Sequence, residues 1–209
     1  MSSLIGGSSD CAAGGLWGRK HLGTESRPLR ADARRNRERL LEVAVGALTG
    51  DADVPLDAIA RRAGVGIGTL YRHFPTREAL VEAAYRSELD RLCAAAPELL
   101  DARPPDVALR AWMDRFVDYM TTKRGMADAL RAVIASGANP YAHSRDRMLD
   151  AVTRLLDAGV AAGSLRADVS PEDVLTGLSG ITLAAGDPER RDQAARLLDL
   201  LMDGLRRRD

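Results

Sequence analysis

Four polar side chains within five consecutive residues carry groups that can form hydrogen bonds with phosphates or with the edges of DNA bases. They are Thr69, Tyr71, Arg72 and His73. A guanidinium can donate paired hydrogen bonds to guanine, so we expect Arg72 to read a base directly. Arg34, Arg37 and Arg77 could bind phosphates near the starts of their helices. Each of these four arginines could equally be a solvated surface charge.

The residues just before this cluster suit the first turn of a helix that lies close to DNA. Gly68 would allow the backbone to approach, because glycine has no side chain. Ile67 offers an apolar surface to a thymine methyl group. Gly66 precedes both and is a tolerable helix cap, so we include it among the expected DNA contacts.

Two short helices joined by a tight turn are predicted to position these side chains. The first begins at Pro55, whose fixed φ suits the first helical position, and ends at Gly64. The second covers residues 67–72 and ends before Phe74 and Pro75. This arrangement is typical of a helix-turn-helix, whose second helix can enter the major groove. The expected small core contains Leu56, Leu70 and Phe74, and small residues at Ala60, Ala63 and Gly64 let the two helices approach.

The same segment carries a family signature. Its positions are Ile59, Ala60, Ala63, Gly64, Val65, Gly68, Thr69, Leu70, Tyr71, Phe74 and Glu78 to Leu80. With them, the stretch from roughly Arg34 to Ala84 resembles the DNA-binding domain of the TetR family of transcriptional regulators. The resemblance implies a homodimer that binds a double-stranded DNA operator and is released by a small-molecule inducer, most simply as a repressor. Two positions depart from the family pattern: Gly66 replaces a frequent serine, and Val54 with Pro55 lack the usual hydroxyl, so some backbone contacts could be weaker.

The periodicity of the whole chain predicts an all-α protein of about nine helices. Residues 1–28 are rich in Gly and Ser and are expected to form a flexible arm. Residues 29–77 are the predicted helix-turn-helix domain, and residues 78–209 the predicted helical ligand-binding and dimerisation domain.

Prolines, glycines and capping residues predict where the other helices begin and end. The first helix is expected to begin near Asp32, and the fourth to stop before Pro97. Asn139 with Pro140 is expected to start a long helix. The expected ends of the fifth and last helices are Met120 and about Arg207.

TetR-like proteins dimerise through their last two helices, and this chain has residues suited to that role. Small residues on one helix and leucines on the next are the expected interface: Gly177, Gly180, Ala184, Leu197, Leu201 and Leu205. Two copies would place their recognition helices in successive major grooves and prefer a near-palindromic operator. The alternative is that these faces pack only within one subunit.

An apolar stripe in the second half could surround a small ligand, since ligand pockets are mostly apolar. The expected lining residues are Trp112, Phe116, Tyr119, Met120, Met126, Ile134 and Met148, with Tyr119, His143 and Arg115 as polar anchors. The same residues could be plain core. A bound ligand would favour a different spacing of the recognition helices, with the fourth helix as the lever.

Composition narrows the function classes. The net charge is zero, but residues 19–77 hold 12 basic and 7 acidic residues, as expected where one domain approaches phosphate. With two cysteines and three histidines we expect no zinc site, metal or cofactor, and no secretion signal or membrane-spanning run is found, which favours the cytoplasm.

Three alternatives to a ligand-released repressor remain. An enzyme is disfavoured because the sequence has no phosphate-binding loop and no nucleophile elbow. An activator, or a regulator without a ligand, would share the same fold. A helical adaptor without DNA affinity would show no salt-dependent DNA binding.

Overall fold

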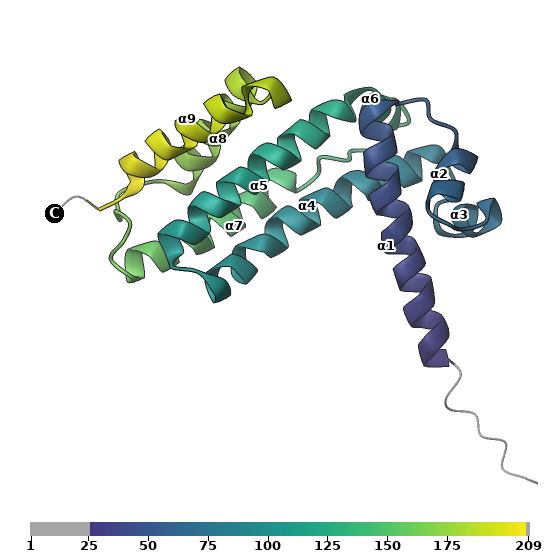
Figure 1. Ribbon diagram of the computed structural model, residues 1–209, viewed down its shortest axis with the longest axis horizontal. Coiled ribbons are helices and arrows are strands. Elements are labelled where there is room, and N and C mark those ends of the chain that lie inside the picture. The colour runs from purple at the N-terminus through teal and green to yellow at the C-terminus, as the bar shows by residue number, and fades with distance from the viewer. Residues whose placement is uncertain (1–25, 208–209) are drawn as a thin grey trace, which may run out of the picture.

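The computed structural model describes the backbone of residues 26–207 and the side chains of residues 32–207. Helices make up nearly all of this part of the chain (Figure 1). The first four are α1 (Ser26–Gly50), α2 (Leu56–Arg62), α3 (Ile67–His73) and α4 (Arg77–Ala102). The others are α5 (Pro105–Gly125), α6 (Ala127–Ala135), α7 (Ser144–Ala161), α8 (Pro171–Ala185), the short 3-10 helix η1 (Pro188–Arg190) and α9 (Arg191–Leu205). The all-α prediction is confirmed, with nine α-helices among the described residues.

The first three helices form a small module against the start of α4. Apolar side chains recur every three or four residues along α1, so that Leu40 and Leu48 lie on one face and are buried in a shared core. Ile59 of α2 and Leu70 of α3 are fully buried in the same core. In Figure 1, α2 and α3 lie together on one side of α1. One face of α3 is thereby fixed to the module, and the other is left outside.

Helix α4 joins this module to the rest of the molecule. It packs on α1 at its beginning and along α5 and α7 further on. Its buried side chains run from Leu80 to Leu99, so one helix belongs to both cores. Helix α4 is thus shared by the small module and the C-terminal bundle.

The C-terminal part is a bundle whose centre is built by α4, α5 and α7. Helices α8 and α9 pack as a pair on α5 and α7, away from α1–α3 (Figure 1). The Ser170 hydroxyl caps α8 by accepting from the amides of Glu172 and Asp173. None of the helices in residues 26–207 is long and apolar enough to cross a lipid bilayer.

Two helices are longer than the sequence predicted. Helix α1 begins at Ser26 rather than near Asp32, with Pro28 in the first turn, where proline is tolerated. Helix α4 does not stop before Pro97 but continues to Ala102. Proline removes one backbone hydrogen bond. The buried residues Ala96 and Leu99 beside it keep α4 in place.

Other limits also differ. Helix α5 runs five residues beyond Met120, and α9 ends at Leu205 rather than Arg207. The long helix expected to start at Asn139 and Pro140 begins only at Ser144. The Asn139 side chain instead accepts a hydrogen bond from the Tyr141 amide in a turn.

Candidate nucleic-acid interface

The turn between α2 and α3 places the two helices at a fixed angle. Gly64 has φ of 69°, a left-handed conformation that glycine adopts without a side-chain clash. The Val65 amide donates to the Ala60 carbonyl at 3.0 Å and closes the end of α2. Ala60 and Ala63 are buried between the helices. The small residues thus do what the sequence predicted, because larger ones would separate α2 from α3.

The first residue of α3 follows Gly66, which has an extended backbone and no capping side chain. Pro55 has the same position before α2, also without a side-chain cap. The two missing hydroxyls noted in the sequence therefore fall at helix N-termini. The amides there stay open to another acceptor, such as a phosphate.

One face of α3 is open to solvent and carries most of the predicted contact residues. Ile67 is 41% exposed and Tyr71 is 49% exposed, although large hydrophobic side chains are usually buried. Gly68 and Arg72 are exposed next to them. Thr69 and His73 lie at the edge of this face and are half-buried, so they are less exposed than Gly68 and Arg72. Leu70 points the other way into the core, so α3 has the division expected of a recognition helix.

Arg34 and Arg37, the two α1 arginines expected to contact DNA, are exposed but already in contact with other side chains. Arg34 pairs with Glu38 at 3.5 Å, a surface ion pair that costs little to break. The Arg37 guanidinium lies 5.4 Å from the centre of the Phe74 ring, at the end of α3. The phosphate contacts expected of both residues stay predictions.

Arg77 lies in the first turn of α4, as predicted, and its guanidinium contacts the backbone of the preceding loop. Its Nη1 donates to the Val54 carbonyl at 2.7 Å, and its Nη2 donates to the Ala52 carbonyl. The side chain is half-buried, so its guanidinium fastens the loop between α1 and α2 to the start of α4. The sequence could not reveal these contacts because the acceptors are backbone carbonyls, and the phosphate contact expected of Arg77 stays a prediction.

Family comparisons agree with this geometry. Residues 43–84 match the model of bacterial regulatory proteins of the tetR family, and residues 104–207 match that of the C-terminal domain of SbtR-like transcriptional regulators. A crystal structure of a TetR transcriptional regulator from Streptomyces coelicolor is 54% identical, with 83% of this chain and 99% of that chain covered and a TM-score of 0.80. The chain belongs to the TetR family of transcriptional regulators.

Other similar proteins support the same membership. A TetR transcription regulatory protein from Mycobacterium vanbaalenii is 36% identical, with 86% of this chain and 100% of that chain covered and a TM-score of 0.71. An HTH-type transcriptional regulator from Staphylococcus aureus is 36% identical over 64 residues. That match covers 30% of this chain and only 35% of the relative's length. Family and fold point to a DNA-binding regulator rather than an enzyme.

The apolar residues expected to line a ligand pocket of this TetR-family protein are mostly closed core. Trp112, Phe116, Tyr119 and Met126 are buried, and Met120 and Met148 are half-buried. Ile134 is 46% exposed on α6, because it lies on the outer side of that short helix. Of the seven, only Tyr119 lines any of four hollows of about 190 to 370 Å³ on the described residues.

The other two expected anchors are also outside a closed pocket. His143 is exposed directly before α7 with φ of 60°, and it lies 3.7 Å from Asp146. Arg115 lines the smallest of the four hollows, beside Tyr119.

A buried group of hydroxyls lies at the centre of the bundle, where α4, α5 and α7 meet. The Tyr85 and Tyr119 hydroxyls are 2.6 Å apart, and Ser144 Oγ is 3.3 Å from Tyr85. Burial, followed by the hydrogen bond to Tyr85, raises the pKa of Tyr119. Sequence reasoning found Tyr119 but missed Tyr85 and Ser144, since nothing in their spacing links three separate helices.

The predicted dimer residues divide between the inside and the outside of the subunit. Leu205 is buried, Leu197 and Leu201 are half-buried against the core, and Gly177 packs beside Leu201. The exposed members are Gly180 and Ala184. Two leucines that the sequence analysis did not select are the most exposed large apolar residues between positions 32 and 207: Leu183 at 85% and Leu200 at 68%.

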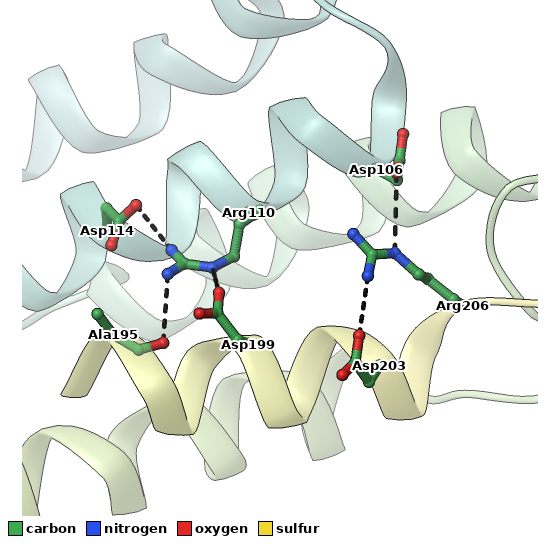
Figure 2. Close-up of polar contacts among 7 residues, drawn as sticks. All are labelled: Asp106, Arg110, Asp114, Ala195, Asp199, Asp203 and Arg206. Carbon is green, nitrogen blue, oxygen red and sulfur yellow. Dashed lines mark hydrogen bonds and ion pairs between the residues drawn. The ribbon is translucent and has the colours of Figure 1, made fainter. Parts of the chain in front are cut away.

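Polar contacts hold α9 on α5 beneath this face (Figure 2). Arg110 of α5 donates from Nε to Asp199 at 2.7 Å and from Nη2 to the Ala195 carbonyl at 3.3 Å. Its Nη1 lies 2.7 Å from Asp114. Near the end of α9, Arg206 lies between Asp106 and Asp203. We call the contacts of Arg110 the Arg110 clamp; it joins α9 to α5, as does the ion pair between Arg191 of α9 and Asp118 of α5.

Proposed function

We propose that this TetR-family protein is a repressor that binds a near-palindromic operator as a homodimer and is released by a small molecule. The observation that supports it most is the outer face of α3, where Ile67, Tyr71 and Arg72 are exposed on a helix whose other side is buried. An arginine and a tyrosine can bind base edges and phosphates, and the isoleucine suits a thymine methyl group. Since its proposed partner is the genome, we propose that it acts in the cytoplasm.

The proposed dimer rests on the outer face of α8 and α9. Leu183 and Leu200 are exposed there, and the space outside Gly180 is open, so a partner helix could approach closely. Exposed leucines on two adjacent helices are unfavourable in water and are typical of a protein interface. A twofold axis through this face would relate two copies of α3.

The proposed response to a ligand rests on α4. Arg77 at its start fastens the loop before α2, and its second half packs on α5 and α7. A ligand that binds one position of α4 better than another would change the spacing of the two recognition helices.

The DNA-binding part is tested by fluorescence anisotropy of the full chain with its own upstream intergenic DNA at two salt concentrations. We expect salt-sensitive binding that Tyr71→Ala and Arg72→Ala weaken at least tenfold. Arg103→Ala, at the far end of α4, is the matched control and should bind like the unchanged protein. Binding no tighter than to random DNA, or equal loss in all three variants, would contradict the proposal.

The direction of regulation needs its own measurement. Transcription from the bound promoter should fall when the protein is added, because the dimer would cover the operator. A rise in transcription would identify an activator with the same fold.

A further inference from the structure

A hollow of about 210 Å³ lies between α4 and α7, outside the closed core. Cys93, Ala96 and Pro97 line it from α4. Arg147, Asp150, Ala151 and Arg154 line it from α7, where their spacing puts them on one helix face. The site thus combines two small apolar walls with charges of both signs.

The charges of this hollow are unequally satisfied. Arg147 is paired with Asp90 at 2.7 Å, and that pair closes one end. Asp150 and Arg154 are exposed and form no ion pair with any residue in the described part of the chain, although they are one helical turn apart. A negative and a positive group therefore face the same small space without neutralising each other.

The backbone supplies a further acceptor. Pro97 lies inside α4 and has no N–H, so the Cys93 carbonyl loses its helical donor four residues later. The Cys93 thiol donates a hydrogen bond to the Arg147 carbonyl at 3.6 Å. Burial raises the pKa of this thiol, so it adds no negative charge at neutral pH. Two exposed charges of opposite sign, Asp150 and Arg154, therefore line the hollow opposite the Cys93 side of α4, where the Cys93 carbonyl lacks its helical donor.

We propose that this hollow binds a small zwitterion of the amino-acid type, with its carboxylate on Arg154 and its ammonium group on Asp150 and the Cys93 carbonyl. A molecule with both charges matches the site better than a simple anion, which Asp150 would repel. Ala96 and Ala151 leave room for a small apolar side chain. Because the hollow adjoins the second half of α4, occupancy would act on the proposed lever; this consequence rests on the proposed function, whereas the binding itself does not.

Binding is tested by calorimetry of the full chain with L-alanine, L-valine and L-leucine in turn. We expect saturable heat with at least one of them. L-leucinamide, which lacks the carboxylate, and 4-methylpentanoate, which lacks the ammonium group, should each bind at least tenfold more weakly than L-leucine. Asp150→Asn and Arg154→Gln should each weaken amino-acid binding at least tenfold.

Arg145→Gln is the matched control, since Arg145 is exposed on α7 and does not line the hollow. It should leave binding unchanged. No saturable heat with any of the three amino acids, equal binding of L-leucinamide, or binding that survives both Asp150→Asn and Arg154→Gln would each overturn the site.

The regulatory consequence is measured by anisotropy with bound DNA. The amino acid that binds should weaken DNA affinity at least threefold in the unchanged protein and not in Asp150→Asn. Binding without any change in DNA affinity would overturn the regulatory role and leave the site. A protein that binds no DNA at all would contradict the proposed function, while calorimetry would still decide the site.

Discussion

Arg77, the first residue of α4, donates a 2.7 Å hydrogen bond to the carbonyl of Val54, two residues before α2 begins. The same guanidinium donates to the Ala52 carbonyl, so one side chain ties the long helix to the loop that positions the helix-turn-helix. The position of α2 and α3 therefore depends on α4 through a contact that does not involve the recognition helix itself.

Replacing Arg77 separates positioning from phosphate binding. Arg77→Gln should lower the free energy of unfolding by about 2 kcal/mol, because hydrogen bonds from a charged group to two carbonyls are lost. DNA affinity should fall, yet the slope of log K against log salt should stay the same, since no phosphate contact is removed. Urea unfolding and anisotropy at several salt concentrations measure both effects.

Arg72→Gln is the comparison for this variant. It should weaken DNA binding with little change in stability, because Arg72 is exposed. A slope reduced by about one in Arg77→Gln would show that Arg77 binds a phosphate after all.

The helix-turn-helix could be predicted closely because its signals are local. The left-handed Gly64, the small Ala60 and Ala63 and the apolar Leu70 each act within a few residues of their place in the sequence. The end of α4 could not be predicted in this way. Pro97 is a local stop signal, but the burial of Leu99 against other helices outweighs it.

The residues predicted for the dimer interface show the same limit. Leu197, Leu201 and Leu205 form a regular apolar stripe on one side of the helix. Such a stripe can pack either on the core of its own subunit or on a partner, and the sequence does not say which. In this subunit Leu205 is buried in the core, whereas Leu200, which is not part of the stripe, is exposed to solvent. Contacts with distant parts of the chain decide the rotation of α9: Leu198 and Met202 are buried, and Arg110 on α5 bonds to partners 85 and 89 residues away in sequence.

The buried Tyr119 hydroxyl should make stability depend on alkaline pH. Its pKa is raised by burial in the folded state, while in the unfolded chain it is near the ordinary value of about 10. The unfolded state therefore loses the proton first, so this contribution is fully present below about pH 10 and is lost as the pH rises above it. Urea unfolding at about pH 8 and pH 10.5 should show the decline.

Tyr119→Phe tests the assignment. It should lower stability by about 1 kcal/mol at pH 8, because the Tyr85 hydroxyl keeps only Ser144 as a partner. It should also make the loss of stability above pH 10 smaller. Tyr71→Phe, on the surface of α3, should change neither quantity; an unchanged alkaline decline in Tyr119→Phe would contradict the argument.

The outward leucines should decide the oligomeric state. Leu183→Asp and Leu200→Asp should each raise the dissociation constant of the dimer at least tenfold, since a charge would be buried without a partner. Sedimentation analysis over a range of concentrations measures this constant. Ile134→Asp on α6 is the matched control, because Ile134 is also exposed but lies off α8 and α9. Equal dissociation in all three variants would exclude this face as the interface.

The Arg110 clamp should stabilise both the subunit and the dimer. Arg110→Met keeps most of the side-chain volume but removes the bonds to Asp199 and the Ala195 carbonyl, so unfolding should become easier by about 2 kcal/mol. The loss stays below that of a fully buried pair because Asp199 is 65% exposed and remains hydrated. The dimer should also weaken at least threefold, since α9 would no longer be held with Leu200 outward.

Arg206→Met is the control: Arg206 lies 3.9 Å from Asp106 and is half exposed, so its loss should cost less than about 0.5 kcal/mol and leave the dimer intact. If Arg206→Met weakened the dimer as much as Arg110→Met, the orientation of α9 would depend on the end of the helix rather than on Arg110 (Figure 2).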